Sequence, residues 1–592
     1  MKHSISKIAL TLGALLCVAA PSLAQNVFTN VPEASAENYI ELYRLSIPTA
    51  AGFNGAAVPY AVDNSGQTIF YDRVAYYLEL DSTYAYASMD RFDSNPNLTR
   101  LGLPNSTTNP VHFRQIVNNL NVVSNSGSVT NGTAIATGNI EMWPSNYNGS
   151  NAQGIPGASG STFDFGDGNS GTGNGYGSFQ VHNYGAAQTI LAYNRWGGSN
   201  GNDDIGIGNS PTGNPDYTFR QNTADYGSRN LQILVRPKQL DLAPANITSV
   251  APEASTFSVV YELPVANANF SPSQYAVDNS SYFPNGSFDR LAYYLELDNG
   301  SGLQYAFVSM DPFTGQASLT GVPQGGTFFE TGVTDVNVVS NVAGVDNGTG
   351  FAGNIEFWPT NYSTGANSGI GGNGGTYDFD DTRSGGGNHG SFQIHNTTVG
   401  ETIIAFNSWN NGGNVGIGIG NQPTGNPDWT FTELGGTFSV KNIWVLANVA
   451  GANLDASAVS GPTIDFGEVD GTAITTLLDE ITLQNSGVMN SVVSINGFTL
   501  TGADPTAFDV SDFAPFLLQG FFDDTVLFDV SFLGGAPGDY SALLTFNTSS
   551  GDVSFNLSAT AAPVPEPASV VIWSLLGLGL VGFGCRRARR SR

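Results

Sequence analysis

Two short acidic loops offer oxygen-based metal chemistry. The first reads Asp164-Phe-Gly-Asp167, the second reads Asp378-Phe-Asp-Asp381, and glycine-rich sequence follows each. Calcium takes about six to eight oxygen ligands, which loop carboxylates and backbone carbonyls supply, and glycine permits the tight turns that aim carbonyls inward. These four aspartates are therefore predicted metal ligands, with calcium as the implied cofactor. Turn capping by the same carboxylates is the structural alternative, because neither loop fits the EF-hand pattern.

Four tryptophans recur at matching places in two halves of the chain and are candidates for stacking on sugar rings: Trp143, Trp196, Trp358 and Trp409. Trp196 and Trp409 stand among Asn and Gly residues, which favours exposure, so they are the stronger carbohydrate-binding candidates. Burial in a hydrophobic core is the alternative for each of the four.

Nucleophilic chemistry finds weak support. Gly197-Gly-Ser-Asn-Gly201 fits the Gly-x-Ser-x-Gly pattern, but no serine stands at the matching place of the second half and no helix is predicted to follow. His182 and His395 do recur, each beside Gln and Asn within a predicted strand. Without a recurrent Ser or Cys partner they are better interpreted as hydrogen-bonded histidines on a sheet face than as catalytic bases.

A pair of carboxylates is the other route to catalysis. Glu79 with Glu141, and Glu296 with Glu356, would supply the two groups that a glycosidase needs. Their repetition supports a structural role equally well. We assign no catalytic residue and predict a non-enzyme, with a carbohydrate esterase or glycosidase as the alternative.

These residues belong to a duplicated segment. Ala75–Asp81 recurs as Ala292–Asp298 and Gly177–Asn183 recurs as Gly390–Asn396, a spacing of about 215 residues. A period this long indicates tandem whole domains, at 26–240 and 250–450. Within them, apolar and polar residues alternate as in half-buried strands. The length and long loops predict an all-β fold with two jelly-roll-like β-sandwiches.

The repeats also resemble a segment found beside the catalytic domain in bacterial proteins known as sialate O-acetylesterases. The shared motifs are Gly-Asn-Ile-Glu-x-Trp-Pro-x-Asn-Tyr, Gly-Ser-x-Gln-x-His-Asn and Gly-Asn-x-Pro-Asp-x-Thr-Phe, over roughly 130–220 and 345–431. The resemblance implies a non-catalytic accessory β module. Residues 451–562 differ in style, predict about seven short strands, and resemble the immunoglobulin-like domains that precede surface-anchoring signals. Such domains act as spacers.

Both ends read as export signals. Lys2 and Lys7 precede an apolar stretch, and the small residues before Gln25 predict a signal peptide over 1–24, cut after Ala24. At the other end, residues 563–592 contain Pro565-Glu566-Pro567, an apolar run from Val570 to Cys585, and an arginine cluster that includes Arg586 and Arg587. Sixteen residues of helix span roughly 24 Å, which predicts a short, transient transmembrane helix.

This C-terminal arrangement resembles the sorting tag that exosortases process in biofilm-forming, exopolysaccharide-making Gram-negative bacteria. The resemblance implies a secreted or cell-surface protein, with signal peptidase and exosortase as partners during export. A permanent tail anchor is the alternative for the same segment.

Composition agrees with an extracellular destination. The chain carries 49 acidic and 20 basic residues, and loss of Lys2, Lys7 and five terminal arginines takes the formal charge from −29 to −36. Such a charge disfavours nucleic acid as a partner. Both cysteines, Cys17 and Cys585, lie in the segments to be removed. We expect a non-catalytic matrix protein that binds extracellular polysaccharide, or alternatively a calcium-stiffened structural or adhesive protein.

Overall fold

A computed structural model gives the fold of most of the three predicted domains. It describes residues 39–47, 58–67, 69–92, 98–104, 113–144, 147–148, 168–169, 178–194, 204–209, 225–265, 275–283, 288–313, 329–358, 362–363, 382–383, 391–407, 416–421, 435–511, 513–522, 525–563, 572 and 574–580. Strands dominate these residues, which confirms the predicted all-β class. The chain divides into two compact units, residues 1–238 and 239–592.

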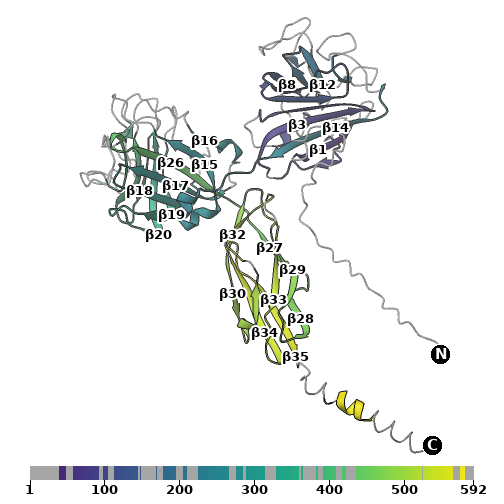
Figure 1. The fold of residues 1–592 in the computed structure, drawn as a ribbon. Helices are drawn as coiled ribbons and strands as arrows, with labels where there is room; N and C mark the ends of the chain where they lie inside the picture. Colours follow the sequence, from purple (N-terminus) through teal and green to yellow (C-terminus); the bar gives the residue numbers. More distant parts are fainter. Residues whose placement is uncertain are drawn as a thin grey trace, which may run out of the picture. The chain divides into compact units, whose positions relative to one another are not determined.

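The first unit contains two layered antiparallel sheets (Figure 1). The larger has the order β2-β1-β14-β3-β4-β6-β7, formed by Val62–Asp63, Ile40–Ser46, Arg229–Pro237, Tyr71–Leu80, Thr83–Asp90, Leu120–Ser124 and Gly132–Ile135. The smaller has the order β13-β12-β11-β8-β5, formed by Asp204–Ile207, Gln188–Asn194, Ser178–Asn183, Gly138–Trp143 and Phe113–Val117. Tyr76 of β3 meets Phe179 of β11 with ring centroids 5.8 Å apart. The core therefore lies between the two sheets.

The second repeat has the same strand order in one continuous ten-stranded sheet. The order is β16-β15-β26-β17-β18-β19-β20-β23-β24-β25, formed by Val277–Asp278, Phe257–Pro264, Val440–Val449, Phe288–Asp298, Leu303–Met310, Phe329–Ser340, Gly348–Trp358, Ser391–Asn396, Glu401–Asn407 and Gly416–Ile419. Strand β19 corresponds to β5 and β6 of the first repeat joined into one strand. Strand β20 likewise corresponds to β7 and β8. Two-stranded ribbons accompany both repeats: β9 with β10 (Tyr147–Asn148, Gly168–Asn169) and β21 with β22 (Tyr362–Ser363, Thr382–Arg383).

The second repeat begins earlier than the predicted residue 250. Leu242 forms an antiparallel bridge with Ser258, and two short helices follow, α1 (Ala245–Thr248) and η4 (Pro252–Thr256). Their apolar side chains join a buried cluster with Tyr294, Trp444 and other residues of the sheet. Sequence periodicity missed this segment because both helices are too short to show a helical repeat.

In both repeats, an arginine fixes the corner where the chain passes from the smaller sheet segment to the larger. The corner residue, Asn119 or Asp335, has a positive φ of 50° or 51°. Arg73 donates to the carbonyl of Asn119 at 2.9 Å, and Arg290 donates to the carbonyl of Asp335 at 3.0 Å. Because a non-glycine residue seldom adopts this conformation, the surrounding bonds must hold it there.

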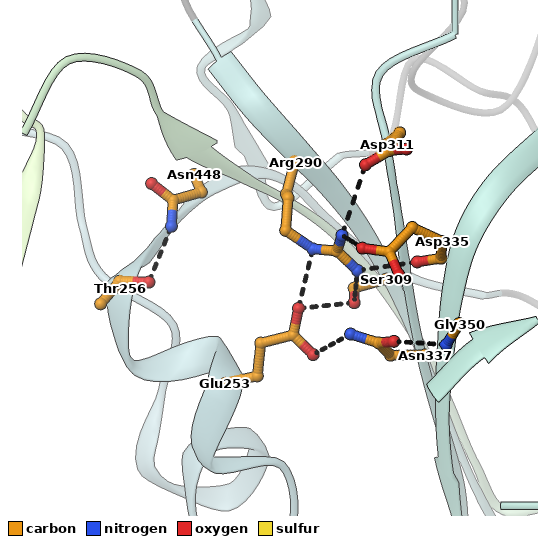
Figure 2. Close-up of polar contacts among 9 residues, drawn as sticks. All are labelled: Glu253, Thr256, Arg290, Ser309, Asp311, Asp335, Asn337, Gly350 and Asn448. Atoms are coloured by element: carbon orange, nitrogen blue, oxygen red, sulfur yellow. Dashed lines mark hydrogen bonds and ion pairs between the residues drawn. The ribbon is translucent and has the colours of Figure 1, made fainter. Parts of the chain in front are cut away.

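The arginine in the second repeat has the larger set of acidic partners (Figure 2). Its guanidinium lies 2.9 Å from Glu253, 2.7 Å from the Asp335 carboxylate and 3.5 Å from Asp311. Glu253 also accepts from Ser309 at 2.7 Å and Asn337 at 3.2 Å. Helix η4 is thereby tied to the corner of the sheet.

Residues 451–562 form a separate two-sheet sandwich, elongated in Figure 1. One sheet has the order β27-β29-β33-β31 and the other β28-β35-β34-β30-β32, from Leu454–Ala458, Thr475–Asn485, Thr525–Phe532, Phe508–Val510, Thr463–Asp470, Val553–Ala562, Gly538–Thr548, Val492–Thr501 and Phe516–Gln519. These nine strands exceed the predicted seven within the described residues. A phenylalanine-rich core that includes Phe508, Phe528 and Phe546 fills the space between them.

Residues 574–580 of the C-terminal segment are helical, and their leucines are exposed. Among the residues described here, no helix has both the length and the apolar character needed to cross a membrane. The signal peptide at 1–24 and most of the predicted transmembrane segment lie outside the described residues.

Two matched glycines provide a test of the close approach between β8 and β11, and between β20 and β23. A Cβ on Gly138 would lie 2.6 Å from the His182 carbonyl, and one on Gly353 would lie 2.5 Å from the His395 carbonyl. We expect Gly138→Ala and Gly353→Ala each to destabilise its own repeat by about 2 kcal/mol, because backbone must shift to relieve the contact.

Differential scanning calorimetry should show the melting transition of the altered repeat shifted downward. Gly66→Ala is the control, since nothing lies within 4 Å of the added methyl. Equal melting temperatures for Gly138→Ala and Gly66→Ala would contradict the described packing.

Candidate functional site

One face of the five-stranded sheet in the first repeat is both polar and buried. Asn139 and Glu141 on β8, and Gln180 and His182 on β11, have fully buried side chains. The strand register sets Gln180 across from Glu141 and His182 across from Asn139. Alternation turns all four side chains away from the core face that carries Phe179. They form a single polar patch on the outer face of the sheet.

Hydrogen bonds link this patch across the two strands. His182 Nδ1 lies 2.9 Å from Asn139 Oδ1, and His182 Nε2 lies 3.3 Å from Gln180 Oε1. Asn139 Nδ2 donates to Glu141 Oε1 at 3.2 Å. The Glu141 carboxylate also approaches His182 Nδ1 to 3.4 Å. The predicted hydrogen-bonded histidine on a sheet face is therefore confirmed.

The second repeat reproduces the patch with Asn354, Glu356, Gln393 and His395, which are also fully buried. The register is the same, with Gln393 across from Glu356 and His395 across from Asn354. Here Nε2 of His395, rather than Nδ1, lies 3.4 Å from the Glu356 carboxylate. We refer to the two sets of four residues as the polar patches.

Both histidines are neutral at physiological pH. Burial lowers the pKa of His182 to about 3 and that of His395 to about 3, because the charged imidazolium would lose its hydration. The contact between each histidine and its glutamate is consequently not an ion pair at neutral pH. The neutral imidazole of His182, bonded to two side-chain amides, suits a structural role that fixes the register of the two strands, since a one-residue slip would bring apolar residues into the patch.

The repeats differ in residue type at one register position next to the polar patches. In the first repeat, Arg114 of β5 stands across from Glu141 in the register, with its guanidinium 5.9 Å from the ring centre of Trp143. In the second repeat, Glu330 of β19 occupies the position across from Glu356. At this matching register position the first repeat therefore has an arginine and the second a glutamate.

Hydroxyl residues of the described part lie on β11, which carries a polar patch, and on the neighbouring strands β12 and β24. The register places Thr189 across from His182 and Thr402 across from His395, and neither threonine hydroxyl has a hydrogen-bond partner among the described residues. Ser178 lies four residues from His182 along β11, which corresponds to about 13 Å. Gly197–Gly201, with the serine of the Gly-x-Ser-x-Gly match, lies outside the described residues.

The glutamates considered as a glycosidase pair lie on opposite sides of the sandwich. Glu79 shares a face of β3 with Tyr77, whose hydroxyl donates to it at 2.9 Å, whereas Tyr76 on the other face enters the core. Glu141 also points away from that core. Two packed sheets, about 10 Å apart, separate the carboxylates, whereas a glycosidase pair requires about 5–9.5 Å. The pairing of Glu79 with Glu141 is therefore wrong.

Most of the residues predicted to form binding or processing sites lie outside the described residues. Trp143 is described, and its side chain is buried. Trp143 is 2% exposed, which disfavours sugar stacking, but alternation along β8 turns its side chain to the face of Glu141 rather than into the core between the sheets. The described residues contain no cluster of three or more potential metal-ligating side chains. The described part does not extend to Ala24, Asp164, Asp167, Trp196, Asp378, Asp381, Trp409, Pro565, Glu566, Pro567, Arg586, Arg587 and the side chain of Trp358.

The repeated motifs include all the residues of the polar patches, but the sequence does not predict that the two strands pair and bring those residues together. Each half of the patch recurs in the duplication, but the register that joins β8 to β11 is a long-range property. Period-two alternation would have placed Asn139 with Glu141, and Gln180 with His182, on one face of each strand.

Comparison with known proteins gives one informative match. The PEP-CTERM protein-sorting motif matches residues 563–590. No curated protein sequence matches the chain. The chain is similar to the "Structure of Vibrio cholerae VesB protease" at 10% identity, over 56% of this chain and 72% of that one, with a TM-score of 0.14. That likeness carries no argument about the repeats.

The sorting motif confirms the predicted C-terminal tag and the coarse localisation. It marks an exported protein that an exosortase processes and that is sorted to the surface of a Gram-negative-type cell. The match covers the C-terminal tag alone, so it does not extend to the polar patches or the repeats.

The polar patches make stability depend on pH in a definite direction. The unfolded chain binds protons on both histidines near pH 6.5 and the folded chain binds them only near pH 3, so protonation favours unfolding within this window. We expect each histidine to lower the unfolding free energy by up to about 1.4 kcal/mol per pH unit as pH falls below 6.5, with no contribution above it.

Calorimetric melting temperatures of the wild type and a His182→Gln/His395→Gln variant, compared from pH 8 to 4, measure this effect. The variant should lose less stability between pH 6.5 and 4 than the wild type, because glutamine does not titrate. Parallel curves for the two proteins would show that the histidines are not neutral and buried in the folded state.

Proposed function

We propose that this exported, surface-associated protein is a non-catalytic component of the extracellular matrix that binds polysaccharide through its two repeats. The observation that carries the proposal is the sorting motif at 563–590, which belongs to the export of surface proteins. The duplication supports it further, because two linked modules that bind one polymer gain avidity without any new contact.

The aromatic connections between strands supply the proposed contacts. Trp196 falls in the connection between β12 and β13, and Trp409 falls at the matching place between β24 and β25. Both are surrounded in sequence by Asn and Gly, whose amides and backbone offer hydrogen bonds to hydroxyl groups. The strands that carry the polar patches, β11 and β23, pair directly with β12 and β24, from which these connections start.

The third domain has the character of a spacer. Its residues 451–562 form an elongated sandwich that directly precedes the sorting motif in the chain. We propose that it separates the repeats from the envelope until the tag is processed, and that calcium at the paired aspartate loops is secondary to polysaccharide binding.

Retention on the polymer tests the proposal directly. The mature fragment 25–562 should be retained on exopolysaccharide isolated from a PEP-CTERM-encoding biofilm former, and the polymer's mass should stay unchanged after incubation. Trp196→Ala and Trp409→Ala should each weaken binding by roughly tenfold, because each removes one stacking platform. The double variant should lose retention.

Trp143→Phe is the matched control, since its ring is buried and should affect melting temperature rather than retention. Failure of the wild type to bind any matrix polysaccharide, together with a large fall in melting temperature on chelation, would favour the calcium-stiffened structural protein. Shortening of the polymer or release of acyl groups would favour the enzyme.

The sorting tag gives a separate prediction. Replacing Pro565, Glu566 and Pro567 with alanine should block exosortase processing, so that the C-terminal arginines remain attached and the protein stays in the membrane fraction. Intact-mass analysis of secreted and membrane-bound protein measures this. Normal release of the altered protein would contradict a role for the tripeptide in processing.

A further inference from the structure

We infer that the second repeat and the third domain are joined at two points and move as one body. The covalent connection, residues 450–453, is the first point. The second is a clamp, formed by Asn490 and Gln519 of the third domain, that holds the backbone of Leu240 in the segment before the second repeat. This inference does not depend on what the repeats bind.

The clamp binds both backbone groups of one residue. The Leu240 N–H donates to Asn490 Oδ1 at 2.9 Å, and Gln519 Nε2 donates to the Leu240 carbonyl at 3.0 Å. Gln519 Nε2 also donates to Asn490 Oδ1 at 3.0 Å. Gln239 Nε2 donates to Gln519 Oε1 at 2.7 Å, so the two clamp residues and the segment form one network.

Burial makes this network more than a surface contact. Leu240 is 1% exposed, Asn490 is fully buried and Gln519 is 2% exposed. Buried amides that lost these partners would leave donors and acceptors without water, which costs far more than breaking an exposed hydrogen bond. The segment before the second repeat is therefore held firmly against the third domain.

The third domain shapes the clamp with its own bonds. Asn490 adopts a positive φ of 64°, and its N–H donates to the Gly520 carbonyl at 3.1 Å. Asn485 Nδ2 donates to the carbonyls of Ser491 and Leu518, both at 2.9 Å. Hydrogen bonds within the third domain hold the clamp residues in position, so binding the segment costs less conformational entropy.

The clamped segment is in turn fixed to the second repeat. The Val259 N–H donates to the Asp241 carbonyl at 2.8 Å, and the Ala243 N–H donates to the Phe257 carbonyl at 2.8 Å. Further along, Glu253 of η4 bonds to Arg290, as Figure 2 shows. Holding Leu240 in place therefore also restrains the second repeat, because the following residues are bonded to its sheet.

The covalent connection enters the same end of the third domain. The Val488 N–H donates to the Gly451 carbonyl at 3.0 Å, and the Ser486 N–H donates to the Asn453 carbonyl at 3.0 Å. Residues 486–490 therefore contact both connections. On the repeat, both attachments flank the start of β15, since Leu242 bridges Ser258 and Ser258 pairs with Ala447. A single covalent link would act as a hinge, whereas a second attachment beside it restricts that motion.

Two variants of the full mature chain test the clamp. Asn490→Gly keeps a residue that tolerates the positive φ and removes the amide acceptor, and Gln519→Leu removes the donor to the Leu240 carbonyl. In hydrogen exchange, the Leu240 amide should be protected in the wild type and should exchange at least about fivefold faster in Asn490→Gly. The Ala243 and Val259 amides should be unchanged.

Asn547→Ala, at a half-buried position of β34 that pairs with Gly497 rather than with the clamp end of β30, is the control and should leave Leu240 protected. Rapid exchange of Leu240 in the wild type, or equal protection in Asn490→Gly, would overturn the clamp. Loss of protection throughout the third domain would mark an unfolded variant, and the second measurement then decides.

Spin labels measure the rigidity itself. Because residues 25–562 contain no cysteine, Ser301→Cys and Ser550→Cys in that fragment would provide unique labels on exposed residues of the repeat and the third domain. Pulsed electron resonance should give a narrow distance distribution, which broadens when Asn490→Gly and Gln519→Leu are added. A broad distribution without those changes, or a narrow one with them, would overturn the inference.

Discussion

The corner at Asn119 and Asp335 is the constraint on which each repeat depends. At this residue the chain leaves one layer of the fold for the other in a backbone conformation that a side chain disfavours, and a buried or half-buried arginine holds the carbonyl in place. The smaller layer, and with it the polar patch, takes its position from this corner. The second repeat extends the same device, since Arg290 also receives Glu253 from the preceding segment. The Arg290 guanidinium thereby holds both the corner of the sheet at Asp335 and the segment that precedes the second repeat.

The polar patches show how a residue with catalytic potential can serve a fold. A histidine close to a carboxylate suggests a general base, but burial holds it neutral and its ring nitrogens contact amides on neighbouring strand positions. Such a layer distinguishes the correct strand register from its slipped alternatives more sharply than apolar packing does. The two repeats differ in sequence at the register position next to this layer, with Arg114 in the first and Glu330 in the second.

The sequence was informative where the information is local or periodic. Alternation in Val74–Leu80 predicts a strand, the duplication predicts two like domains, and Pro565-Glu566-Pro567 with its flanking segments predicts the sorting tag. Long-range features could not be predicted in this way. The pairing of His182 with Asn139 depends on register, and the separation of Glu79 from Glu141 depends on which sheet each strand joins. The docking of Leu240 joins residues about 250 positions apart through backbone groups, which every residue possesses.

The strand order of the repeats has a consequence for how the chain acquires its fold after translocation. The final strand of each repeat, β14 or β26, inserts between the first strand and the third rather than adding at an edge. Each sheet therefore stays open at its centre until the last residues of its repeat have emerged, and loop closure over this separation is slow. During that interval the equivalent strand of the adjoining repeat is a competitor for the vacancy, as in the misassembly of tandem arrays. Sequence divergence between the copies is thus a safeguard against exchange of partners.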